Sequence, residues 1–181
     1  METQTREART KNTMTSNIYL TGFMGCGKSH TGHRLADLLG LPFLDLDAAV
    51  ETAAGKTINA IFADDGEAAF RDLETEALHA TRHGPVSVIA TGGGAPCFND
   101  NMTWMNARGK TVFLDPPPAV LLARLEAGRA HRPLLQTGAE LSTFVARKLA
   151  SRRPFYEKAQ IQLVLANPKA DAARLLSDLL R

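Results

Sequence analysis

Residues Gly22–Ser29 match the pattern G-x-x-x-x-G-K-[ST], which is typical of a phosphate-binding loop between a strand and a helix. Glycines in such a loop let the backbone approach a phosphate closely, and the backbone N–H groups and the following helix N-terminus form an anion site. Lys28 is expected to reach the β- and γ-phosphates of a nucleotide, and the Ser29 hydroxyl is expected to bind Mg²⁺. The alternative interpretation is a Gly-rich turn with a purely structural role.

Two carboxylates, Asp45 and Asp47, stand at the end of the next predicted strand. Side chains two residues apart on an extended chain face the same way, so one carboxylate is expected near Mg²⁺ and the other near a substrate hydroxyl. The alternative for Asp47 is an N-cap of the helix expected over Ala48–Ala53.

Arg71 and Glu74 are i, i+3 neighbours on a predicted helix. A functional interpretation is a guanidinium fork that its carboxylate partner holds in place to bind an anionic group. The alternative is a solvated ion pair on the surface of the helix.

Three glycines, Gly92–Gly94, follow the third predicted strand. Glycine at the carboxyl end of a strand indicates close backbone approach, and a ligand is the expected partner. A plain tight turn is the alternative.

The segment Gly128–Gly138 breaks the helical periodicity, is basic and has a glycine at each end, as a mobile lid would. Arg132 within it is expected to reach a transferring phosphate, although an exposed basic loop is the alternative. Further along, Pro154 is expected to kink or end a long helix near Arg153, which would aim Arg152 or Arg153 into the cleft.

Apolar runs alternate with helical patterns, which predicts a three-layer α/β fold whose parallel sheet is flanked by crossover helices. The expected strands are 17–21, 42–45, 86–90, 110–114 and 161–165, and the expected helices are 28–39, 48–53, 58–64, 67–82, 99–107, 117–126, 139–158 and 170–180. Ligands of such sheets bind beyond the carboxyl ends of the strands. Pro168 follows the last strand, in the position of a loop that would cover a nucleotide base.

The chain has 181 residues, and we expect one domain over residues 17–181 after a disordered extension over residues 1–16. A net charge of +2 does not indicate nucleic acid or an anionic membrane as a partner, and no apolar run has the length of a membrane span. Cys26 and Cys97 lie far apart without metal-ligand spacing, which suits a reducing cytoplasm. We expect a monomer.

Taken together, these segments resemble the shikimate kinase family. The segments that carry the resemblance occur in the family's order and spacing across residues 17–168 and are Gly22–Ser29, Asp45–Asp47, Phe70–Glu74, Gly92–Gly94, Arg132–Leu135 and Arg152–Tyr156. The phosphate-binding loop alone is generic, whereas the series that follows it is specific.

The resemblance implies a nucleoside-monophosphate-kinase-like P-loop fold with strand order 2-3-1-4-5, and ATP-dependent phosphorylation of the 3-hydroxyl of shikimate in aromatic amino acid biosynthesis. By this match, the catalytic residues would be Lys28, Asp47 and Arg132. The ATP-binding residues would be Gly25, Cys26, Gly27, Lys28, Ser29, His30, Arg132 and Pro168. Shikimate would be bound by Asp47, Arg71, Gly92, Gly93, Gly94 and Arg152, and Mg²⁺ by Ser29 and Asp45. Glu74 would orient Arg71.

Two other functions compete with this interpretation. The first is another small-metabolite P-loop kinase, such as a gluconate kinase, against which the pairing of Asp45–Asp47 with Phe70–Glu74 argues. The second is a non-catalytic nucleotide-switch module, which would need a GTPase-type N-K-x-D motif that the sequence lacks.

Overall fold

Five parallel strands form one sheet within the part of the chain that the computed structural model describes, residues 14–128, 138–167 and 170–180. The strands are β1 (Asn17–Thr21), β2 (Phe43–Asp45), β3 (Val88–Ala90), β4 (Gly109–Asp115) and β5 (Ile161–Val164). Their order is β2-β3-β1-β4-β5, and every neighbouring pair is parallel. The expected sheet and its strand order are therefore confirmed.

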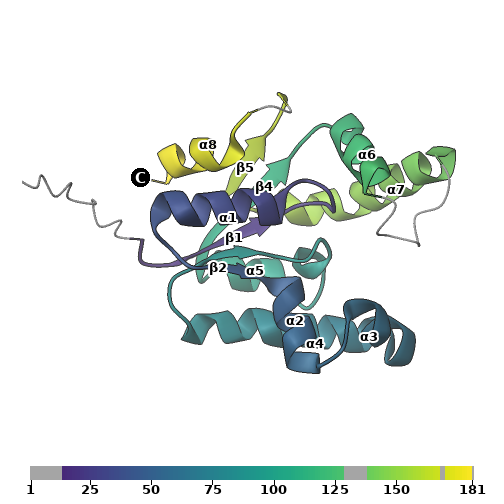
Figure 1. Ribbon diagram of the computed structural model, residues 1–181, viewed down its shortest axis with the longest axis horizontal. Coiled ribbons are helices and arrows are strands. Elements are labelled where there is room, and N and C mark those ends of the chain that lie inside the picture. Colours follow the sequence, from purple (N-terminus) through teal and green to yellow (C-terminus); the bar gives the residue numbers. More distant parts are fainter. Residues whose placement is uncertain (1–13, 129–137, 168–169, 181) are drawn as a thin grey trace, which may run out of the picture.

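Helices cover this sheet and extend beyond its carboxyl edge (Figure 1). They are α1 (Lys28–Leu39), α2 (Leu46–Ala54), α3 (Ile58–Asp64), α4 (Gly66–Ala80), α5 (Asn101–Asn106), α6 (Pro118–Ala127), α7 (Gly138–Tyr156) and α8 (Ala172–Leu179), with 3₁₀ turns η1 (Thr81–His83) and η2 (Ala95–Cys97). Helices α1 and α8 pack against each other, α2, α3 and α4 form a second group, and α6 packs on α7.

The central strand β1 carries apolar side chains on both faces of the sheet, and helices cover both faces. All five of its residues are buried. Ile18 and Leu20 belong to a large apolar cluster with Leu35 and Leu39 of α1. Tyr19, which points to the opposite face, belongs to a second cluster that contains Leu78, Met102 and Met105 of α4 and α5. A strand buried on both faces is expected to have consecutive apolar residues, as Ile18–Leu20 are in the centre of this one.

A third and smaller apolar cluster lies away from the sheet. Val50 of α2, Ile61 of α3 and Phe70 of α4 form it, and each of these side chains is almost fully buried. The three helices therefore pack around a core of their own.

Several element boundaries differ from the expectation by one or two residues, and two of the differences have identifiable local causes. Helix α5 begins at Asn101, two residues later than expected, because Asn99 and Asp100 adopt left-handed backbone conformations with φ of 50° and 53°. Helix α7 continues through Pro154 to Tyr156, two residues short of the expected bound at 158, so Pro154 does not end the helix near Arg153. Pro154 thus lies in the last turn, where its missing N–H removes only one helical hydrogen bond.

Some expectations concern segments outside the described residues. These are residues 1–13 of the expected extension, residues 129–137 of the expected lid, Arg132 and Pro168. Met14, the first described residue, is partly buried against the large apolar cluster. Across the described ranges, no helix is both long and apolar enough to span a membrane.

Candidate active site

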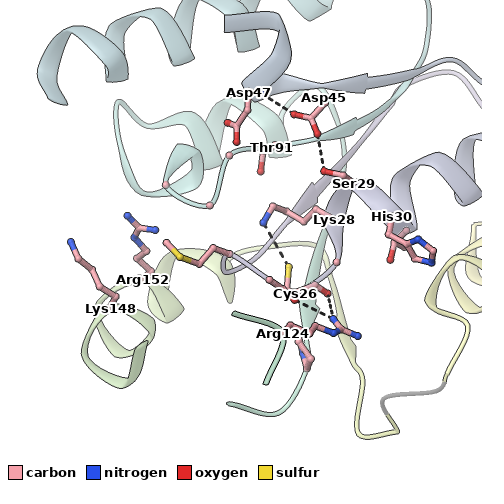
Figure 2. A pocket seen from close by; sticks show the side chains of 18 of the residues that line it. Cys26, Lys28, Ser29, His30, Asp45, Asp47, Thr91, Arg124, Lys148 and Arg152 are labelled. Atoms are coloured by element: carbon pink, nitrogen blue, oxygen red, sulfur yellow. Dashed lines mark hydrogen bonds between the residues drawn. The ribbon is translucent and has the colours of Figure 1, made fainter. Parts of the chain in front are cut away.

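A cleft of about 1360 Å³ runs along the carboxyl edge of the sheet (Figure 2). The loop between β1 and α1, the ends of β2 and β3, and helices α4, α6 and α7 all contribute lining residues. This is the edge at which ligands of open parallel sheets bind, because the connections on its two sides diverge there.

The loop between β1 and α1 has the backbone that the glycine pattern requires. Gly22, Gly25 and Gly27 have φ of 134°, 79° and 101°, which side-chain-bearing residues rarely adopt. A Cβ atom on Gly22 would also lie only 2.8 Å from the Leu114 carbonyl oxygen of β4. Gly27 occupies the N-cap position of α1 without a side-chain cap, so the N–H groups of the first turn face the cleft.

Lys28 points from the first turn of α1 back across this loop (Figure 2). Its ammonium donates hydrogen bonds to the carbonyl oxygens of Gly22 at 2.8 Å and Phe23 at 3.1 Å. The Cys26 thiol, 3.7 Å from Lys28 Nζ, is 1% exposed and belongs to the large apolar cluster. Cys26 therefore contributes packing through its side chain and presents only its backbone to a phosphate.

Arg124 of α6 also binds this loop, and no sequence motif indicates that contact. Its Nη1 donates to the carbonyl oxygens of Gly25 and Cys26, both at 3.1 Å. The guanidinium thus adds a second positive charge beside that of Lys28 at the phosphate-binding end of the cleft.

Ser29 and Asp45 meet at the same end of the cleft. Ser29 Oγ donates to Asp45 Oδ2 at 2.7 Å. The other carboxylate oxygen, Asp45 Oδ1, accepts from the backbone N–H groups of Asp47 at 3.1 Å and Ala48 at 3.4 Å. Asp45 is therefore the N-cap of α2.

This cap corrects two details of the expectation for Asp47. Asp47 is not the N-cap, so that alternative is wrong, and it lies within α2 rather than on extended chain. The two carboxylates still line the same cleft, because the strand-to-helix turn carries both to its wall. Burial raises the pKa of Asp47, and the negative charge of Asp45 raises it further, against the opposing effect of Lys28.

Arg71 and Glu74 form a buried ion pair on α4. Arg71 Nη1 donates to Glu74 Oε2 at 2.7 Å, and the two residues are only 8% and 1% exposed. The alternative of a solvated surface pair is therefore wrong. A second carboxylate that was not among the predicted partners, Glu67, accepts from Arg71 Nη2 at 3.1 Å and Nε at 3.4 Å. Burial raises the pKa of Glu74, whereas Arg71 lowers it.

The glycines after β3 make room for these charged side chains. A Cβ atom on Gly92 would overlap Glu74 Oε1 and lie 2.8 Å from Asp47 Oδ1. A Cβ atom on Gly94 would lie 2.5 Å from Arg71 Nη1. The sequence predicts that this glycine backbone lies close to a partner. Within the described structure, that partner is the pair of carboxylates and the guanidinium.

Helix α7 contributes two cations to the cleft. Arg152 and Lys148, one turn apart, both line it (Figure 2). The i, i+4 spacing from Arg152 is the signal that identifies Lys148 in the sequence. Arg153 makes a bidentate pair with Asp115 at the end of β4, at 2.6 Å and 3.0 Å, and does not line the cleft. Of the two adjacent arginines, Arg152 is therefore the one that faces the cleft.

The structure brings together all of the expected site residues that it describes. They line one cleft and are Gly25, Cys26, Gly27, Lys28, Ser29, His30, Asp45, Asp47, Arg71, Gly92, Gly93, Gly94 and Arg152. The phosphate-binding loop lies at one end of the cleft and the cations Lys148 and Arg152 lie at the other, with Asp47 between them (Figure 2). This arrangement suits phosphoryl transfer to an anionic acceptor, which needs positioning and charge neutralisation.

Comparison with known proteins agrees with this geometry. The shikimate kinase from Bacteroides fragilis strain ATCC 25285 is 48% identical over 144 residues, which are 78% of this chain and 80% of the relative. The crystal structure of shikimate kinase from Bacteroides thetaiotaomicron has a TM-score of 0.85 and 42% identity, and covers 91% of this chain and 98% of its own. Shikimate kinase from Acinetobacter baumannii, solved in complex with shikimate, has a TM-score of 0.81 and 36% identity, covering 93% and 92%.

The match extends through the whole cleft. The family model described as shikimate kinase matches residues 24–180, which include the helices around the cleft and all of the phosphate-binding loop except Gly22 and Phe23. On the matched length and the identity of its relatives, this chain belongs to the shikimate kinase family.

Proposed function

We propose that the chain transfers the γ-phosphoryl group of ATP to the 3-hydroxyl of shikimate and releases shikimate 3-phosphate and ADP, as a step of aromatic amino acid biosynthesis. The observation that carries the proposal is the position of Asp47 in a cleft between a phosphate-binding loop and the buried Arg71. Family membership favours this function over both a gluconate kinase and a nucleotide switch.

The residues present fit Mg²⁺ as the metal that accompanies ATP. Ser29 Oγ and Asp45 Oδ2 are oxygen donors that lie 2.7 Å apart beside the phosphate-binding loop. Mg²⁺ prefers oxygen ligands and is usually bound by one or two protein groups together with substrate phosphates and waters. When bound, the ion would neutralise charge on the phosphates.

In this proposal, the residues of the site have distinct roles. Lys28 exchanges its loop carbonyls for the phosphate oxygens of the nucleotide. Asp47 orients the acceptor hydroxyl or takes its proton, a role that a raised carboxyl pKa supports. Arg132 is proposed to approach the transferring group from the lid, and Pro168 is proposed to cover the base of ATP.

Arg71 is proposed to bind the acceptor carboxylate. A guanidinium has five N–H groups. Three of those on Arg71 donate to Glu67 and Glu74, which leaves one on each Nη nitrogen within the described structure. Two N–H groups on adjacent nitrogens match the two oxygens of a carboxylate. Arg152 and Lys148 add positive charge to the same end of the cleft.

The direct test is ADP release by the purified chain with ATP and Mg²⁺, measured with shikimate, with gluconate and without an acceptor. We expect ADP release to depend on shikimate. Release that depends on gluconate would support the other metabolite kinase, and GTP turnover that no acceptor changes would support the switch module.

Replacing Arg71 with lysine is expected to weaken acceptor binding although the charge is kept. Lysine has no planar fork and cannot make the same bidentate pair. Each charge-assisted hydrogen bond that is lost should weaken binding by about ten- to a hundredfold, or about 1.5–3 kcal/mol. Steady-state kinetics should show a higher KM for shikimate and little change in the KM for ATP. Arg82→Lys makes the same chemical change at an exposed arginine outside the cleft and is the matched control.

A shikimate analogue without the carboxylate completes a double cycle with this variant. The analogue should bind the wild-type chain poorly, and Arg71→Lys should weaken its binding little further. If the two losses simply add, Arg71 does not bind the carboxylate and its role is limited to the ion pairs with Glu67 and Glu74.

A further inference from the structure

Phe98 packs against Arg71 from a loop that is remote from it in sequence. The Phe98 ring centroid lies 4.3 Å from Arg71 Cζ, closer than the ring of the neighbouring Phe70 at 4.9 Å. Phe98 is 36% exposed and belongs to none of the apolar clusters. It is also absent from the lining of the cleft. Neither core packing nor direct ligand contact therefore accounts for a phenylalanine at this position.

The loop that carries Phe98 is tied to α4 immediately beside Arg71. Asn99 Nδ2 donates to Thr75 Oγ1 at 2.9 Å and to the Arg71 carbonyl oxygen at 3.4 Å. Asn101 Nδ2 donates to the same Thr75 hydroxyl at 3.1 Å. Thr75 Oγ1 in turn donates to the Arg71 carbonyl oxygen at 2.9 Å. These bonds join the loop to the turn of α4 from which the Arg71 side chain starts.

The backbone after Phe98 supports the same conclusion. Asn99 and Asp100 are the only non-glycine residues in the described ranges with positive φ. Consecutive left-handed residues are unfavourable for L-amino acids, so the surrounding contacts must hold them in place. The turn that they make brings the Phe98 ring onto Arg71 and the Asn99 amide onto Thr75.

We propose that Phe98 is a positioning residue for the acceptor, because its ring holds the Arg71 guanidinium in one orientation before the acceptor binds. This inference rests on the proposed function, in which Arg71 binds the acceptor carboxylate. Glu67 and Glu74 bind the guanidinium through its N–H groups, and Gly94 lies against it so closely that no Cβ fits between them. Phe98 completes this enclosure.

An aromatic ring suits this role better than an aliphatic side chain. A ring stacked over a guanidinium attracts it through its quadrupole and leaves the in-plane N–H groups available for hydrogen bonds. An arginine held in this way loses little further freedom when a ligand binds, which strengthens binding without any new contact to the ligand.

The test compares Phe98→Leu and Phe98→Tyr with the wild-type chain in shikimate phosphorylation. Phe98→Leu should raise the KM for shikimate by about three- to tenfold, the range expected for loss of a partly exposed cation–π contact, and leave the KM for ATP unchanged. Phe98→Tyr keeps the ring and should restore the wild-type value. Leu38→Ala removes apolar area from a comparably exposed residue, 38% exposed on α1, and should change neither constant.

A double cycle with Arg71→Lys tests the contact itself. The free energies of unfolding of the wild type, the two single variants and the double variant should show coupling between Phe98 and Arg71. In the Arg71→Lys background, Phe98→Leu should raise the KM for shikimate less than it does in the wild type.

The outcomes separate this inference from the proposed function. Absence of coupling in unfolding would overturn the inference, and so would an unchanged KM for shikimate or an equal rise in both KM values in Phe98→Leu. Failure of the wild-type chain to phosphorylate shikimate would overturn the proposed function, while the unfolding cycle would still decide whether the ring holds Arg71.

Discussion

Replacing Lys28 with methionine is expected to abolish phosphoryl transfer and leave the fold intact. The Lys28 ammonium contacts carbonyl oxygens of the phosphate-binding loop and the Cys26 sulfur, and methionine has a similar length without the charge. Loss of a preorganised group that stabilises charge in the transition state lowers turnover by about 10²–10³-fold or more. The rate of ADP formation with saturating shikimate measures the effect, and circular dichroism measures the fold.

Lys110→Met is the matched control for this variant. Lys110 is an exposed lysine near the start of β4, outside the cleft, so the same substitution there should leave turnover unchanged. Turnover close to the wild-type value in Lys28→Met would contradict the assignment of the loop to nucleotide phosphates.

Replacing Asp47 with asparagine is expected to lower turnover by about 10²–10⁴-fold if Asp47 acts as a general base. Asparagine keeps the size of the side chain and removes its negative charge and basicity. Because Ser29 and Asp45 remain in place, nucleotide affinity should change little. The kcat for shikimate phosphorylation and the Kd for ATP are the two measurements.

A structural role for Asp47 predicts a different result. In that case the thermal midpoint would fall, and the surviving folded fraction would turn over normally. We expect the midpoint to be nearly unchanged, because Asp45 and not Asp47 caps α2. Asp37→Asn, at an exposed position on α1, controls for the loss of one carboxylate charge.

Features that depend only on residues close together in the sequence can be predicted from it. The phosphate-binding loop is one of them, because its glycines and the start of α1 follow from a short local pattern. The i, i+3 pair of Arg71 and Glu74 is another, because it depends only on helical geometry. The strand order was implied by resemblance to a family, not by the residues of any single strand.

Features that depend on the tertiary arrangement were missed or misplaced. The contact of Arg124 with the loop joins residues that are 98 positions apart in the sequence, and no local pattern indicates it. Phe98 meets Arg71 only because two left-handed residues turn the chain back onto α4. Both aspartates are good caps, so the sequence alone does not distinguish Asp45 from Asp47 as the N-cap of α2, and only the point at which β2 ends decides between them.

The small core formed by Val50, Ile61 and Phe70 has a consequence for protein engineering. It lies within α2, α3 and α4, whereas the phosphate-binding loop packs on the large cluster beneath α1. Substitutions in cores that share no contacts have nearly additive effects on stability. A combinatorial library confined to Val50, Ile61 and Phe70 can therefore reshape the three helices at the acceptor end of the cleft, while the large cluster beneath the phosphate-binding loop stays unaltered.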